Sequence, residues 1–129
     1  MSFRDVMALI LVIDDDDTMR RMVRRILEGA DHEVFEATGG RQGTKLFAER
    51  RPDLVITDIV MPDKEGIETI LDIRGINETA KIIAVSGGGV DIGLNYLGVA
   101  GRLGATAVLA KPFRASELTD LVAFVLSDG

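Results

Sequence analysis

The chain has 129 residues, a length that suits one compact domain able to bury its own core. Its net charge of -6 disfavours binding to the phosphate backbone of nucleic acids. Cysteine is absent, which excludes disulfides and thiolate metal sites, and no stretch approaches the roughly 20 apolar residues of a membrane helix. We therefore expect a cytoplasmic protein that binds neither nucleic acid nor a membrane.

The chain begins with a continuous apolar run that ends in four aspartates. Residues 8–13 are apolar throughout, which predicts a strand buried on both faces. Residues 18–29 then carry apolar side chains at helical spacing, and Asp16 or Asp17 can cap this helix while Gly29 can end it. We expect the arginines of this helix to form a solvated face. They are Arg20, Arg21, Arg24 and Arg25.

The same alternation of apolar runs and helical patterns continues to the end of the chain. Further strands are predicted at Glu33–Ala37, 54–57, 81–85 and 107–110, and further helices at 41–50, 67–76, 91–103 and 116–126. Regular alternation of this kind predicts an α/β fold, with one doubly wound sheet of five parallel strands and helices on both faces. Right-handed crossovers place the carboxyl ends of all the strands at one edge of such a sheet.

Residues with useful chemistry directly follow four of the predicted strands. Asp14 and Asp15 follow the first strand, Asp58 the third, Ser86 the fourth and Lys111 the fifth. Clustered carboxylates repel one another unless a cation intervenes, and an all-oxygen site suits Mg²⁺. With a lysine and a hydroxyl added, such a pocket can hold a phosphoryl group in transfer. Each residue alone could be a cap, a turn or a surface residue, so the hypothesis rests on the set.

Four segments of the sequence resemble the motifs of response-regulator receiver domains, in the same order and at similar spacing. They read LVIDDDDTMRRMVRRIL, LVITDIVMPDKEG, IIAVSGG and VLAKPF. The resemblance covers about residues 8–126 and implies a single receiver domain over 1–129 with no output domain. It also implies the flavodoxin-like strand order 2-1-3-4-5.

The resemblance implies a role for each of these residues. Asp58 is expected to accept the phosphoryl group, and Lys111 to pair with that group. Ser86 is expected to act as the switch hydroxyl, which moves to form a hydrogen bond with a phosphoryl oxygen. Mg²⁺ is expected to bind Asp15, Asp58 and the backbone carbonyl of Val60 directly, and Asp14 through water. The bond between Lys111 and Pro112 is often cis in this family.

The resemblance also implies partners. The phosphoryl donor is expected to be a sensor histidine kinase or a phosphotransfer protein, and a downstream protein target is expected to dock on the face formed by 87–126. Beyond catalysing its own phosphorylation and dephosphorylation, such a domain is not an enzyme. The sequence leaves open whether the protein is a monomer or a weak dimer.

Two positions depart from the family pattern. Val108 stands where receiver domains often carry an aromatic residue whose side-chain rotamer changes on phosphorylation. The second departure is the run Gly87, Gly88 and Gly89, which directly follows Ser86. Because glycine permits large backbone changes, we expect switching to rely on this loop and the glycine-diluted helix after it.

Two alternatives remain at this point. The run from Asp14 to Thr18 also fits the nucleophile motif of haloacid-dehalogenase-like phosphatases, with Asp14 as nucleophile and Asp16 as acid and base. The other alternative is a receiver-like module that binds a partner without being phosphorylated.

Overall fold

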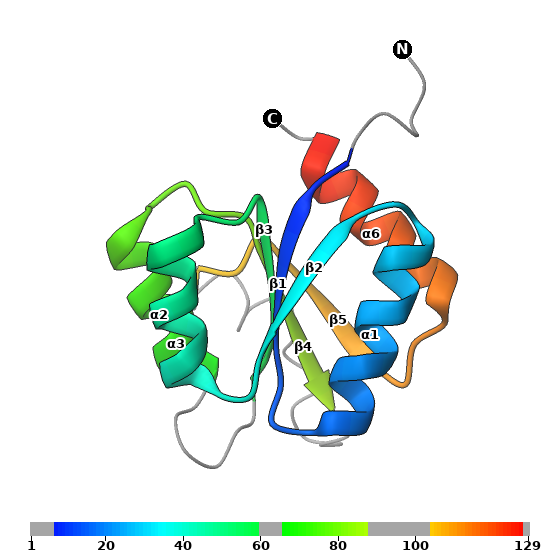
Figure 1. Ribbon diagram of the computed structural model, residues 1–129, viewed down its shortest axis with the longest axis horizontal. Coiled ribbons are helices and arrows are strands. Elements are labelled where there is room, and N and C mark those ends of the chain that lie inside the picture. Colours follow the sequence, from blue (N-terminus) through cyan, green and yellow to red (C-terminus); the bar gives the residue numbers. More distant parts are fainter. Residues whose placement is uncertain (1–6, 60–65, 88–103, 128–129) are drawn as a thin grey trace.

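The structure is a computed structural model that describes residues 7–59, 66–87 and 104–127. Its five strands form one parallel sheet in the order β2-β1-β3-β4-β5. Helices α1 and α6 cover one face of the sheet and α2 and α3 cover the other (Figure 1). The predicted fold class, strand order and double winding are confirmed.

The elements lie close to their predicted bounds. They are β1 (Leu9–Ile13), α1 (Asp17–Gly29), β2 (Glu33–Ala37), α2 (Gly40–Arg50), β3 (Leu54–Asp58), α3 (Gly66–Ile76), β4 (Ile82–Gly87), β5 (Ala107–Lys111) and α6 (Ala115–Ser127). The fourth strand runs two residues further than predicted, because Ser86 and Gly87 pair with Ala110 and Lys111 of β5. The helix predicted at 91–103 lies outside the described residues.

The core consists of two layers, one on each side of the sheet. Ile10 and Val12 of β1 point into the layer beneath α1 and α6, while Leu11 and Ile13 point into the layer beneath α2 and α3. Because both faces are covered, the inner strand β1 carries apolar side chains at every position, which explains its continuous apolar run. Within the described ranges, none of the helices combines the length and hydrophobicity needed to cross a membrane.

Helix α1 is capped by the acidic run that precedes it. The Asp16 side chain accepts hydrogen bonds from the backbone N–H groups of Thr18 and Met19, at 2.9 and 3.2 Å. This satisfies two of the donors that a helix leaves unpaired at its start. The helix ends at Gly29 as predicted, and the left-handed backbone conformation that follows is adopted by Asp31, with φ of 71°.

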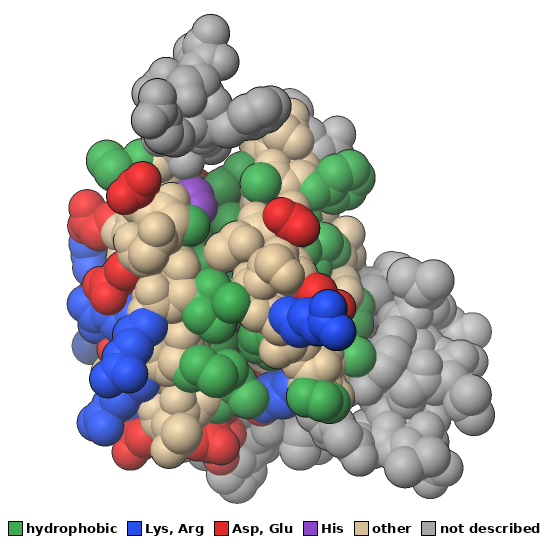
Figure 2. Space-filling view, turned by 90° about the vertical axis from the view of Figure 1, so that its right-hand side faces the viewer, with side chains coloured by type: hydrophobic (Ala, Val, Ile, Leu, Met, Phe, Trp, Pro, Cys, Tyr) green, Lys and Arg blue, Asp and Glu red, His purple; other side chains and the backbone are tan. Residues whose placement is uncertain are grey.

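The expectation that all four arginines of α1 form a solvated face is wrong for Arg20. Arg21 and Arg25 are exposed and Arg24 is half-buried, but Arg20 is only 6% exposed. Figure 2 views the side of the molecule formed by α1 and α6, and many charged side chains of both signs lie along its left-hand margin. Arg20 is buried because it shares the inward stripe of α1 with Val23 and Leu27.

Helix α2 packs closely against β1 at Gly43. A Cβ atom at this position would lie 2.4 Å from Cδ1 and 2.8 Å from Cγ1 of Ile13, which is itself fully buried. The absence of a side chain at Gly43 therefore sets how near α2 approaches the strand that carries the first aspartates.

We predict that Gly43→Ala lowers the free energy of unfolding by about 1–3 kcal/mol, because the buried Ile13 side chain must move to make room. The matched control is Gly75→Ala in α3, where no described atom outside the two neighbouring residues and the helix's own backbone lies within 4 Å of the added Cβ. That variant should gain up to about 1 kcal/mol, since alanine favours the helix. Urea unfolding measures both changes, and equal effects of the two substitutions would contradict the close packing at Gly43.

Candidate functional site

Three carboxylates meet at the carboxyl edge of the sheet. Asp14 directly follows β1, Asp15 comes next, and Asp58 is the last residue of β3. One carboxylate oxygen from each residue lies within 4.8 Å of the others. Asp14 and Asp58 are 4% and 8% exposed, whereas Asp15 is exposed. The cluster therefore has two buried members and one member open to solvent.

Lys111 reaches this cluster from the end of β5. Its Nζ atom donates a hydrogen bond to Oδ2 of Asp58 at 3.1 Å and lies 3.8 Å from Oδ2 of Asp14. The peptide bond between Lys111 and Pro112 is cis. A single ammonium group thus faces two buried carboxylates and offsets part of their repulsion.

Burial dominates the electrostatics of Asp14. Loss of hydration raises the pKa of the Asp14 carboxyl from 3.8 to about 6. A hydrogen bond from the Asp16 N–H at 2.9 Å and the charge of Lys111 lower this pKa in part, while Asp58 and Asp15 raise it further. Even with the Lys111 ammonium nearby, ionisation of Asp14 therefore carries a free-energy cost near neutral pH.

The remaining predicted site residues differ in where they lie. Ser86 is fully buried in β4, one residue beyond Val85, which pairs with Asp58. Val60 lies outside the described residues. Val108 of β5 is half-buried and packs against the core layer beneath α2 and α3.

Gly66 is a site residue whose importance the sequence did not reveal. A Cβ atom at Gly66 would lie 2.1 Å from the carbonyl oxygen of Asp58, and the Gly66 N–H donates to the Ile59 carbonyl at 2.8 Å. In the sequence, Gly66 is only the last residue of the segment LVITDIVMPDKEG, and its spacing indicates no role in the site. In the fold, the first residue of α3 lies directly against the backbone that carries Asp58.

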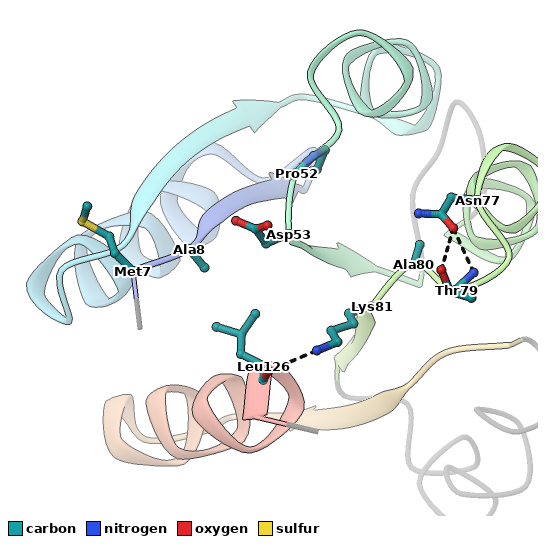
Figure 3. Close-up of a pocket in the computed structure, with 9 residues that line it drawn as sticks. All are labelled: Met7, Ala8, Pro52, Asp53, Asn77, Thr79, Ala80, Lys81 and Leu126. Carbon is teal, nitrogen blue, oxygen red and sulfur yellow. Dashed lines mark hydrogen bonds between the residues drawn. The ribbon is translucent and has the colours of Figure 1, made fainter. Parts of the chain in front are cut away.

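A separate cavity of about 430 Å³ lies at the opposite, amino-terminal edge of the sheet (Figure 3). Its polar side chains bond to nearby chain segments: Lys81 donates to the Leu126 carbonyl at 3.1 Å, and Asp53 accepts from the Leu9 N–H at 2.8 Å. His32, the one histidine of the sequence, also lies at this edge and accepts from the Ala8 N–H. The cavity is thus remote from the acidic cluster.

The donor set at the carboxyl edge fits Mg²⁺. The clustered ligand atoms are all carboxylate oxygens, the hard donors that Mg²⁺ prefers, and the exposed Asp15 leaves room for the waters that Mg²⁺ retains. The sequence contains no cysteine, so the pocket has no thiolate ligand. A divalent cation and the Lys111 ammonium together make this edge suitable for a dianionic group such as phosphoryl.

The doubly wound sheet and its carboxylate and lysine pocket define the class of phosphoryl-accepting signalling domains. The chain matches the family model of the response regulator receiver domain over residues 10–123 and belongs to this family. It is a receiver domain of two-component signalling. Such domains accept phosphoryl groups, bind Mg²⁺ in an acidic pocket, and interact with histidine kinases or phosphotransfer partners.

Individual relatives agree with this assignment. The chain is 37% identical to chemotaxis protein CheY of Thermotoga maritima over 112 residues, spanning 86% of this chain and 91% of that protein. It is 30% identical to sporulation initiation phosphotransferase F of Bacillus subtilis over 113 residues, spanning 88% and 89%. A receiver domain structure from Clostridium thermocellum matches with a TM-score of 0.81 and 30% identity, covering 95% and 93%. These comparisons do not support the phosphatase or the non-phosphorylated alternative.

We predict that Asp14→Asn stabilises the metal-free protein at pH 7.5 but not at pH 3. The folded state raises the pKa of Asp14 to about 6, so ionisation above that pH destabilises the fold by up to about 3 kcal/mol. Below the unfolded value of 3.8 both states are protonated and the penalty vanishes. Urea unfolding in chelator across this pH range measures the difference. Asp120→Asn, at an exposed position of α6, controls for the loss of one negative charge. If Asp14→Asn raised the stability equally at every pH, the raised pKa of Asp14 would be contradicted.

Gly66→Ala is predicted to disturb the site through the backbone. The clash involves main-chain atoms of Asp58 and Ile59, which no side-chain rotation can relieve. We expect a loss of about 2 kcal/mol or more in unfolding free energy and shifted amide signals at Asp58 in NMR spectra. A spectrum with unchanged Asp58 and Ile59 signals would show that α3 simply moves away.

Proposed function

We propose that Asp58 is the phosphoacceptor of this receiver domain, in a reaction that depends on Mg²⁺. The observation that carries the proposal is the position of Asp58: a buried carboxylate at a strand end, 3.1 Å from the Lys111 ammonium and within 4.8 Å of two more carboxylates. Asp14 and Asp15 lack the hydrogen bond to Lys111 that Asp58 receives, and both lie in the loop after β1.

In the proposed step, a carboxylate oxygen of Asp58 forms a bond to phosphorus as the bond to the donor breaks. For a phosphohistidine donor, the P–N bond breaks, its electron pair stays on the imidazole nitrogen, and that nitrogen takes up a proton. The product on the protein is an acyl phosphate. Lys111 is positioned to stabilise the negative charge of the phosphoryl oxygens during this exchange.

We further propose a metal site and a switch residue at the same edge of the sheet. We assign Asp15, Asp58 and the Val60 carbonyl as direct Mg²⁺ ligands, and Asp14 as a ligand through water. Bound Mg²⁺ would neutralise charge on the phosphoryl oxygens. Ser86, in the neighbouring strand, is the proposed hydroxyl that bonds the transferred group.

The domain is proposed to act by changing protein contacts. The proposed donor is a sensor histidine kinase or a phosphotransfer protein, in a cytoplasmic setting. The downstream target is proposed to dock on residues 87–126, of which 88–103 lie outside the described residues; the described part includes β5 and most of α6. On this proposal the domain, whose core spans about residues 8–126, modifies only itself and is not an enzyme with a separate substrate.

We predict one added phosphoryl group, detected by intact-mass spectrometry, after the protein is incubated with acetyl phosphate and Mg²⁺. The adduct should be absent from Asp58→Asn and from wild type treated with chelator, because each lacks either the acceptor or the cation. Asp120→Asn, an exposed carboxylate on α6, is the matched control and should be modified like wild type.

The position of the adduct separates the competing functions. An adduct that survives Asp58→Asn but disappears in Asp14→Asn would favour the phosphatase-like arrangement and refute the proposal. No adduct on any variant, with acetyl phosphate or with a phosphorylated histidine donor, would favour a binding module.

A further inference from the structure

Arg20 is a buried cation that the proposed phosphoryl chemistry does not use. It lies on the inward stripe of α1 and is only 6% exposed. Burying a guanidinium group is strongly unfavourable unless its donors find acceptors in good geometry. The hydrogen-bond partners of Arg20 must therefore account for its burial.

The guanidinium group of Arg20 bonds three separate parts of the chain. Its Nη1 donates to the Asp14 backbone carbonyl at 2.9 Å, its Nε to the Glu36 carboxylate of β2 at 2.7 Å, and its Nη2 to the Asp17 carboxylate at 2.6 Å. The planar, forked shape of arginine allows such bonds in fixed directions at once, which the ammonium of lysine does not.

These bonds complete the attachment of Asp14. Its N–H donates to the Ala37 carbonyl at 3.1 Å, its Oδ1 accepts from the Asp16 N–H at 2.9 Å, and its carbonyl is held by Arg20. The remaining oxygen, Oδ2, faces Lys111. With both backbone groups and one carboxylate oxygen fixed, the direction of the other oxygen is also fixed.

A second arginine secures the partner of Arg20. Arg24 donates to the other oxygen of Glu36 at 2.7 Å and to Glu28 at 3.0 Å, and among the described residues it makes no hydrogen bond to the loop after β1. Arg24 thus shares the ion-pair network without touching Asp14, and it serves as a natural control.

We propose that Arg20 is a positioning residue for the metal site: through the Asp14 carbonyl it orients the Asp14 and Asp15 carboxylates toward Asp58. This inference rests on the proposed function only in taking the acidic cluster as the Mg²⁺ site. If Arg20 acted only through its charge, removing it would tighten Mg²⁺ binding to the acidic cluster. A positioning role predicts the opposite, namely weaker Mg²⁺ binding.

The test is the dissociation constant for Mg²⁺, measured by titrating the full chain after chelator treatment and following amide signals by NMR. Arg20→Met, which fills the buried space without the hydrogen bonds, should bind Mg²⁺ about tenfold or more weakly, as expected for loss of an outer-shell contact. Arg20→Lys keeps the buried charge and should still bind Mg²⁺ at least about threefold more weakly than wild type.

Two control variants separate positioning from loss of stability. Arg24→Met and Val23→Ala should remain within about twofold of wild type in Mg²⁺ affinity, although Val23→Ala opens a core cavity and lowers the unfolding temperature. If Arg20→Met fails to fold, the Arg20→Lys result decides the question.

Each outcome has a defined meaning. Unchanged or tighter Mg²⁺ binding in the folded Arg20 variants would overturn the inference while leaving the proposed function intact. Equal weakening in Val23→Ala would also overturn it, because Arg20 would then act only through stability. Wild type that binds no Mg²⁺ would refute the proposed metal site, and the inference with it.

Discussion

Lys111 lies 3.1 Å from Asp58 and 3.8 Å from Asp14, and the rest of the site depends on this contact. Like charges within 4.8 Å of each other repel strongly where water is partly excluded. One ammonium group offsets part of that repulsion and leaves the cluster with a surplus of negative charge. The pocket is therefore suited to a divalent cation, and with that cation to a phosphoryl group.

The backbone around this pocket is held by close contacts that leave little freedom. Gly43 lets α2 approach Ile13, the residue before Asp14, and Gly66 lets α3 approach the carbonyl of Asp58. Arg20 fixes the Asp14 carbonyl from the side of α1. Helices on both faces of the sheet thus contribute to the position of the same carboxylates, which links the packing of the fold to the geometry of the site.

Much of the fold could be predicted because parallel, doubly covered strands leave a simple pattern. The strand at Leu54–Asp58 is apolar until its last two residues, so its end and the placement of Asp58 at the sheet edge follow from the sequence alone. The end of β4 could not be placed in the same way. Ser86 and Gly87 extend that strand because β5, far along the chain, supplies their hydrogen-bonding partners.

For the residues that the structure describes, the sequence by itself determined which elements form, in what order, and which carboxylates, hydroxyl and lysine lie near one edge of the sheet. The periodicity of apolar residues is a local property, which is why it can be read without a structure. Only the tertiary structure decided that Arg20 is buried, that the pKa of Asp14 rises to about 6, and that Gly66 touches the backbone of Asp58. Each of these depends on how much water is excluded and which distant segment packs nearby, and neither quantity is encoded in local spacing.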